Sequence, residues 1–108
     1  MDTLIAIRLL TGAQVTGQGA AVDAMQLGSP QTFTGTVKAP GAVAVSAVVT
    51  ILARNDSDEG WLQLGVLTMS GTSPAADGFA SAARYMQYAA RVDALSGAGA
   101  AVSINAAG

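Results

Sequence analysis

Turn-forming residues divide this chain into short segments, and this spacing restricts the folds that it can adopt. The 13 glycines are spread along the sequence, and Ser, Thr or Pro accompanies many of them. Between these points no long amphipathic helical pattern persists, whereas runs rich in β-branched and aromatic residues recur. Strand-length runs separated by turn signals are typical of a sandwich or a closed barrel. The sequence therefore predicts an all-β fold, and we expect a β-sandwich.

The clearest predicted strand covers residues 42–53, where alternate residues fall on two faces. Both faces are mostly apolar, which indicates a central strand covered on both sides or a strand in an interface between copies. One face carries Val43, Val45, Ala47, Val49 and Ile51, and the other carries Ala44, Ser46, Val48, Thr50 and Leu52.

Six further segments are predicted strands, separated by turns or loops. Asn55–Gly60 is predicted to be a polar hairpin loop, and Gly65 a bulge or bend in the return strand. Residues 75–90 have a composition that also suits an α-helix, although Gly78 and the alternation after Tyr85 oppose it. The six segments are residues 4–10, 20–26, 32–37, 61–70, 85–94 and 100–105.

The apolar residues are mostly Ala and Val, so the core has to be built from small side chains. Each of them buries little area, at ~25 cal/mol per Å². We expect residues 1–108 to form a single β-sandwich domain that self-associates, as a dimer or trimer, or docks on a larger body. The predicted core contains Val45, Val49, Ile51, Trp61, Leu64, Met86, Tyr88 and Val92.

Composition argues against several classes of protein. Apolar residues make up 51% of the 108 residues and charged residues only 11%, which is the opposite of a disordered chain. The five basic residues are scattered, so we expect no nucleic-acid partner. Cysteine and histidine are both absent, which removes disulfides, thiolate metal sites and the commonest general base.

Two segments were considered for targeting or membrane insertion. The start, Met1 to Arg8, has no basic region before its short apolar run, so we expect no signal peptide. Residues 39–53 are weakly polar but shorter than the ~20 apolar residues of a spanning helix. We therefore expect no membrane partner.

Two patterns resemble ligand-binding loops only in part. The loop Asn55 to Glu59 offers closely spaced oxygens, but the twelfth position of a calcium loop that starts at Asp56 is Leu67 rather than Glu. The glycines Gly12, Gly17 and Gly19 lack the Lys and hydroxyl of a phosphate loop. We expect a solvated hairpin loop in the first case and turns in the second.

Catalytic side chains show no convincing pattern. No feature of the sequence brings two carboxylates together for glycoside hydrolysis. We expect Asp93 to pair with Arg91 on an exposed strand face and Asp77 to be a turn residue. No histidine is available to activate a serine. We therefore assign no catalytic residue, cofactor-binding residue or metal ligand. The carboxylates and serines considered for these roles are Asp23, Glu59, Asp77, Asp93, Ser70, Ser73 and Ser81.

The aromatic residues allow one further hypothesis. Trp61, Tyr85 and Tyr88 would suit a sugar-stacking platform, which would make the chain a carbohydrate-binding module. We favour a core position for Trp61, because a core of Ala and Val needs large side chains to fill it.

The second half of the chain, from Ala53 to Ala106, resembles small structural proteins of tailed bacteriophages. The resemblance is one of style and composition over about half of the sequence. The segments that carry it are Gly60-Trp61-Leu62-Gln63-Leu64-Gly65, Leu67-Thr68-Met69-Ser70-Gly71-Thr72, Ala76-Asp77-Gly78-Phe79-Ala80, Tyr85-Met86-Gln87-Tyr88-Ala89-Ala90-Arg91-Val92 and Ala94-Leu95-Ser96-Gly97-Ala98-Gly99-Ala100-Ala101-Val102.

This resemblance implies a virion structural protein with a jelly-roll-like sandwich and no cofactor. The first expectation is a capsid decoration, or cement, protein that binds the major capsid protein on the outside of the shell. Such a protein would be made in the bacterial host cytoplasm and found in the virion. The alternatives are a tail or baseplate accessory protein and, from another class, the carbohydrate-binding module. The terminal segment Asp2 to Leu10 is the first candidate for the docking element, because a terminal apolar run can extend a partner's sheet.

Overall fold

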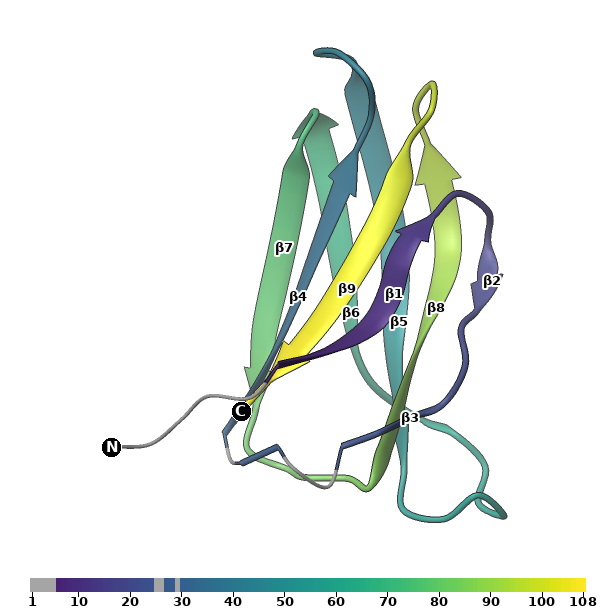
Figure 1. The fold of residues 1–108 in the computed structure, drawn as a ribbon, viewed down its shortest axis with the longest axis vertical. Coiled ribbons are helices and arrows are strands. Elements are labelled where there is room, and N and C mark those ends of the chain that lie inside the picture. Colours follow the sequence, from purple (N-terminus) through teal and green to yellow (C-terminus); the bar gives the residue numbers. More distant parts are fainter. Residues whose placement is uncertain (1–5, 25–26, 29) are drawn as a thin grey trace.

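The computed structural model describes residues 6–24, 27–28 and 30–108, which form two antiparallel β-sheets packed face to face (Figure 1). No helix occurs in this described part, so the predicted all-β sandwich is confirmed. The strands are β1 (Ala6–Ala13), β2 (Gly17–Gln18), β3 (Val22–Asp23), β4 (Gln31–Lys38), β5 (Ala44–Arg54), β6 (Leu62–Thr72), β7 (Ala75–Ser81), β8 (Gln87–Ser96) and β9 (Ala101–Ala107).

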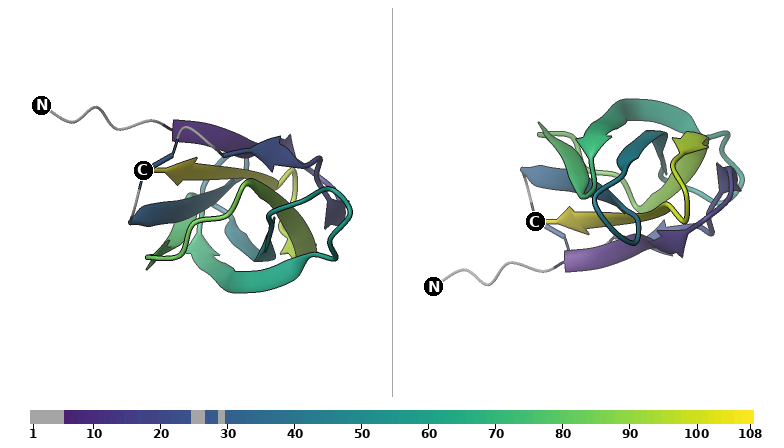
Figure 2. Two further views of the ribbon diagram at one scale, coloured as in Figure 1. Left: turned by 90° about the horizontal axis from the view of Figure 1, so that it is seen from below. Right: turned by 90° about the horizontal axis from the view of Figure 1, so that it is seen from above.

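The strand pairs are nested around the turn between β5 and β6. Strand β5 pairs with β6, β4 with β7, the short strands β2 and β3 with β8, and β1 with β9. The chain is thus a long hairpin that is rolled into two sheets, with strand orders β1-β9-β4-β7 and β2-β8-β5-β6, and β3 beside β8. Figure 2 looks along the strands and shows the two layers. This nesting is the jelly-roll topology, as expected.

The predicted strands match the observed ones closely in the middle of the chain and poorly near its start. Strand β4 extends the segment predicted at 32–37 by one residue at each end. The strand predicted at 20–26 is reduced to Val22–Asp23 within the described residues, and β2 was not predicted. Residues 4 and 5 of the first predicted strand lie outside the described residues, and β1 continues past Gly12 to Ala13.

Residues 75–90 do not form the alternative helix. They form β7, a short connection and the start of β8. Asp77 is therefore not a turn residue, because it lies in the middle of β7, opposite Gly35. The alternation that opposed a helix after Tyr85 was the more reliable signal in this region.

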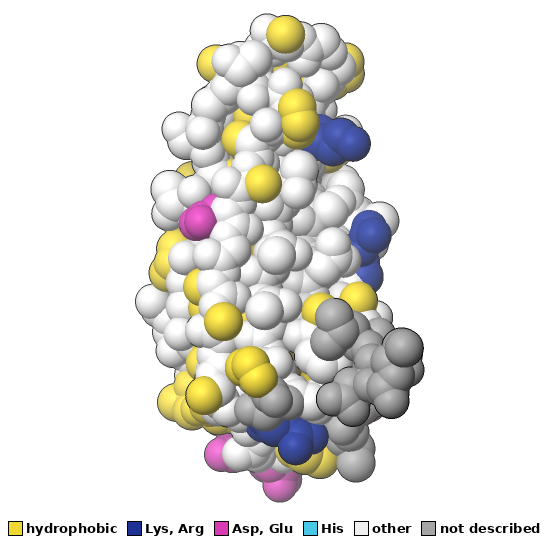
Figure 3. All heavy atoms as spheres, turned by 90° about the vertical axis from the view of Figure 1, so that its left-hand side faces the viewer, with side chains coloured by type: hydrophobic (Ala, Val, Ile, Leu, Met, Phe, Trp, Pro, Cys, Tyr) yellow, Lys and Arg dark blue, Asp and Glu magenta, His cyan; other side chains and the backbone are white. Residues whose placement is uncertain are grey.

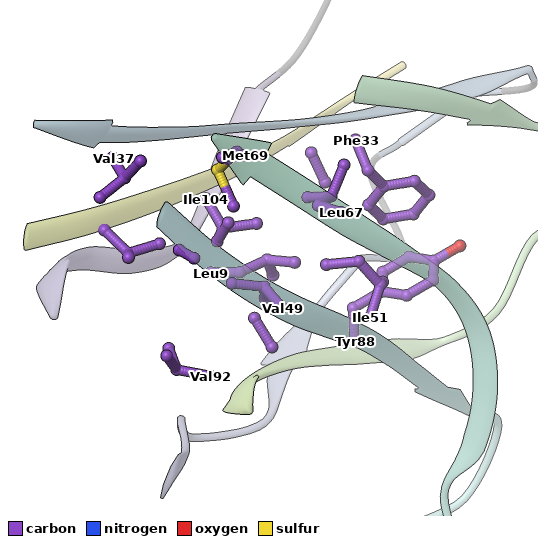
Figure 4. Close-up of a cluster of buried hydrophobic side chains, with 14 of the residues drawn as sticks. Leu9, Phe33, Val37, Val49, Ile51, Leu67, Met69, Tyr88, Val92 and Ile104 are labelled. Carbon is purple, nitrogen blue, oxygen red and sulfur yellow. The ribbon is translucent and has the colours of Figure 1, made fainter. Parts of the chain in front are cut away.

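The core lies between the two sheets and is filled by inward-facing residues of both. Its large aromatic side chains pack together, with the ring centroid of Phe33 5.2 Å from that of Phe79 and 5.0 Å from that of Tyr88. Figure 4 shows Phe33 and Tyr88 at one end of the cluster of buried side chains. Five of the eight residues predicted for the core are buried, namely Val45, Val49, Ile51, Tyr88 and Val92.

Three of the predicted core residues lie elsewhere. Trp61 is half-buried outside the core, where the Arg54 guanidinium carbon lies 4.0 Å from its ring centroid. Met86 precedes β8 and is 40% exposed. Leu64 is half-buried and only packs against the core. The core volume expected from these three side chains is supplied instead by other buried residues, namely Phe33, Leu67, Met69 and Ile104.

One polar pair is enclosed in this core. The Tyr88 hydroxyl donates a hydrogen bond to Gln31 Oε1 and accepts one from the backbone N–H of Tyr85, at 3.2 Å. Gln31 is fully buried, and its Nε2 atom has no hydrogen-bond partner among the residues that the structure describes. Burial raises the pKa of Tyr88, and the hydrogen bond from Tyr85 and the bond to Gln31 only partly offset this rise.

Candidate functional site

The outer surface of the sheet β1-β9-β4-β7 is built almost entirely from small side chains. Because directly paired residues share a face, the strand registers define its members. We call this surface the threonine face. It comprises the cross-strand rows Ala6–Ala107–Thr32–Ala80, Arg8–Asn105–Thr34–Gly78, Ser103–Thr36–Ala76 and Ala101–Lys38.

The threonine face is exposed or half-buried along its length. Its charged residues are Arg8 and Lys38, and both are exposed. Short side chains lose little conformational freedom on contact, and uncharged ones cost little to desolvate. The face therefore has the properties of a surface that can lie flat against another protein.

The outer surface of the other sheet, β2-β8-β5-β6, differs because its polar side chains bind one another. Arg91 Nε lies 2.7 Å from Asp93 Oδ1, and the Thr50 hydroxyl donates a hydrogen bond to Asp93 Oδ2. The bond from Thr50, together with Arg91, holds the pKa of Asp93 below its ordinary value, although partial burial opposes this effect. The predicted pairing of Asp93 with Arg91 is thus confirmed.

A break in the strand register explains why Asp93 faces Thr50. Val49 pairs with Val92, but Val48 pairs with Ala94, so Asp93 is the extra residue of a bulge. A bulge turns a side chain away from the regular alternation. Val92 therefore points into the core, whereas the side chain of Ala94, two residues later, points to the outer surface and is exposed.

A second polar network crosses the same surface near the Asn55–Gly60 loop. Gln87 Nε2 donates to Asp23 Oδ1 at 3.1 Å, and Arg54 Nε donates to Gln87 Oε1 at 2.9 Å. The Arg54 guanidinium also covers the ring of Trp61. This network links β3, β8 and β5 and uses Trp61 as an internal contact rather than as a free stacking surface.

The sugar-stacking platform, the hypothesis not favoured for Trp61, Tyr85 and Tyr88, is not assembled. Tyr88 is fully buried in the core, and Tyr85 packs edge-on against it with a centroid distance of 6.4 Å. Trp61 lies beside Arg54 in the network just described. The three aromatic side chains therefore do not form one exposed surface.

The Asn55–Gly60 loop uses its oxygen atoms to bind its own backbone. Glu59 Oε1 accepts from the N–H of Asn55 at 3.0 Å, and Asp56 Oδ1 accepts from the N–H of Asp58 at 3.0 Å. Asn55 Oδ1 accepts from the N–H of Met86. No group of three or more acidic, His or Cys residues that could hold a metal ion occurs among the residues that the structure describes.

The four carboxylates considered for catalysis belong to four separate local networks. Asp23 binds Gln87, Glu59 binds its own loop, and Asp93 binds Arg91 and Thr50. Asp77 Oδ2 accepts from the N–H of Thr68, on the neighbouring edge strand β6, at 2.9 Å. Of the three serines considered, Ser73 forms hydrogen bonds with the backbone of Ala39, and Ser81 with that of Ala83.

The glycines weighed as a phosphate loop occupy strand and turn positions. Gly12 lies in β1 with φ 58°, and Gly17 lies in β2 with φ 136°. The N–H of Gly19 donates to the carbonyl of Ala90 at 2.9 Å.

Shallow depressions open at both ends of the sandwich. One, of about 370 Å³, lies between residues 14–16 and the β8–β9 turn, and another, of about 450 Å³, lies between the adjoining ends of β5 and β6. Their described lining residues include no titratable group. A third, of about 280 Å³, is lined by Ala24, Arg84, Tyr85 and Met86, and Arg84 also donates to the carbonyl of Leu27.

Large apolar side chains are exposed at separate places. Val15 is 75% exposed, Leu62 55% and Val66 42%. Figure 3 looks onto the edge formed by β6 and β7, where hydrophobic atoms are scattered and acidic side chains gather at the lower end. Across the described residues, no helix has the length and apolar composition needed to cross a membrane.

The fold and its surfaces define a jelly-roll β-sandwich whose most uniform surface is the threonine face. Comparison with known proteins gives no match to a protein family, a curated protein or a solved structure.

Proposed function

We propose that this chain is a capsid decoration protein of a tailed bacteriophage, which binds the major capsid protein on the outside of the shell and stabilises it. Jelly rolls are common in viral capsid and lectin domains. The lectin-like alternative needs an exposed aromatic platform, and Tyr88 lies in the core instead. The observation that carries the proposal is the threonine face, a broad surface of small and mostly uncharged side chains.

Stabilisation of this kind requires binding but no reactive group. A shell under internal pressure fails where its subunits separate, so a rigid module that contacts neighbouring subunits raises the cost of separation. A surface with few charges to desolvate suits such a contact. Because a shell repeats the same site many times, weak single contacts act together when the bound copies also contact one another.

We also propose that copies associate as a dimer or trimer. The second face of the central strand β5 does not carry this proposal, because Thr50 and Leu52 are already buried within the chain. Val66, on the edge strand β6, is the better candidate contact. Val66→Asp should shift sedimentation towards the monomer, whereas Val15→Asp, at a more exposed position, should not. A monomer at all concentrations for the unmodified protein would contradict this proposal.

The test of the main proposal uses capsids that lack the protein. Purified protein is mixed with undecorated shells, and the bound amount and the temperature of shell disruption are measured. Saturable binding that raises this temperature is expected. Binding to isolated tails in place of shells would favour the tail or baseplate alternative, and binding to neither would refute both.

A further inference from the structure

Most polar side chains of the threonine face make no internal hydrogen bond, unlike those of the opposite surface. The exceptions are Ser103 Oγ, which accepts from the N–H of Gly12, and the Thr32 hydroxyl, which donates to the carbonyl of Ala107. Five side chains of this face make no side-chain hydrogen bond or ion pair with any residue that the structure describes. They are Arg8, Lys38, Thr34, Thr36 and Asn105. They stand on three strands of one sheet. Their hydrogen-bonding capacity is therefore open to solvent or to a partner.

On the opposite surface, many polar side chains already form hydrogen bonds with one another. Arg91, Asp93 and Thr50 bind one another, and Arg54, Gln87 and Asp23 form a second connected network. A partner docking there would have to compete with these internal contacts or bury them without adding to them. On the threonine face, only the single bonds of Thr32 and Ser103 with backbone groups would be buried in this way, among the described residues.

The charge of the threonine face indicates the chemistry of its partner. The chain has a formal net charge of −2, yet this face carries Arg8 and Lys38, and none of the described acidic residues belongs to its rows. Arg8 lies in the same row as Thr34, two strands away, and Lys38 follows Thr34 by four residues on β4. At ~4.8 Å between strands and ~3.3 Å per residue, the two cations start about 16 Å apart.

We propose that the threonine face is the surface that docks on the shell, and that its partner is a flat protein surface with carboxylates spaced to meet Arg8 and Lys38. This assignment rests on the function proposed above. The threonines and Asn105 contribute hydrogen bonds between the two cations, while the small alanines and Gly78 allow close approach. Opposite charges across a contact guide association and set its orientation.

The test compares four proteins for binding to undecorated shells over a range of salt concentrations. Thr34→Glu places a carboxylate in the centre of the threonine face, and Thr72→Glu is its matched control at the exposed end of β6. The double variant Arg8→Gln/Lys38→Gln removes the two cations. Thermal melting checks that each variant folds, and Thr32→Glu replaces Thr34→Glu if the latter does not.

We expect Thr34→Glu to weaken shell binding about tenfold or more, and Thr72→Glu to bind like the unmodified protein. The double variant should bind more weakly at low salt, with a flatter dependence on salt. If the unmodified protein binds and Thr34→Glu binds equally well, the face is wrongly assigned and the function stands. If only the double variant is unaffected, the carboxylate-bearing partner is wrong. If the unmodified protein does not bind shells, the proposed function itself fails.

Discussion

The outer end of the Phe79 ring points at Gly65, so a β-carbon at position 65 would be only 2.6 Å from Phe79 Cζ. Phe79 belongs to β7 and Gly65 to β6, so this contact joins the two sheets at one edge of the sandwich. Phe79 also stacks on Phe33, which limits how far its ring can move away.

Gly65→Ala should therefore destabilise the fold by about 1–3 kcal/mol, as overpacking of a well-filled core does. Gly60→Ala is the matched control, because a β-carbon there meets no atom within 4 Å. Chemical denaturation of both variants measures the difference. Equal stability of the two variants would contradict this, because it would show that the Phe79 ring moves aside at no cost in the free energy of unfolding.

Tyr88→Phe should destabilise the protein by about 1–3 kcal/mol, because it removes the one hydrogen-bond partner that the buried Gln31 amide has among the described residues, and also the acceptor of the Tyr85 N–H. Replacing both groups, as in Gln31→Met/Tyr88→Phe, should recover the part of this loss that comes from the unpaired Gln31 amide, whereas the Tyr85 N–H loses its acceptor in both variants. A double variant less stable than Tyr88→Phe alone would contradict the account of this pair.

Asp77→Ala should expose the edge of the sandwich. The Asp77 carboxylate accepts the N–H of Thr68 on the edge strand β6 and so occupies a donor that could pair with another chain. We expect lower stability and more aggregation on heating, measured by light scattering. Asp58→Ala, which removes the same charge from the exposed loop, should behave like the unmodified protein. Equal aggregation of both variants would point to net charge instead.

Thr50→Val should raise the pKa of Asp93, because the Thr50 hydroxyl is the main group that lowers it. With a lowered pKa in the folded state, the unfolded chain binds more protons in acid. The contribution of Asp93 to stability is thus complete above its ordinary value of 3.8 and is lost as the pH falls through the lowered pKa.

The stability gap between the unmodified protein and Thr50→Val should therefore be widest near neutral pH and should narrow in acid. Denaturation at several pH values, with carboxyl titration followed by NMR, measures both quantities. A gap that widens in acid would contradict this assignment.

Residue patterns predicted the long strands because their alternation reflects one buried face. Tyr88, Ala90 and Val92, for example, are apolar at alternate positions because all three side chains pack in the core. The register shift between Ile51 and Leu52, opposite Gln63 and Gly65, likewise confirms the predicted irregularity at Gly65.

Features that depend on partners distant in sequence were not predictable. Trp61 was assigned to the core by size alone, but Arg54 provides a partner that only the hairpin brings near. Asp77 resembles a turn residue because it precedes glycine, and its real role depends on β6 lying beside β7. The threonine face was missed because its rows combine four strands, and Thr32, Thr34 and Thr36 alone indicate only an exposed strand face.

The most direct test of the central claim is a cryo-electron microscopy image of the phage particle that carries this protein. The account predicts repeated density of the size of this sandwich on the outer capsid surface, with the threonine face turned towards the shell. Density confined to the tail or baseplate, with a bare capsid surface, would contradict it.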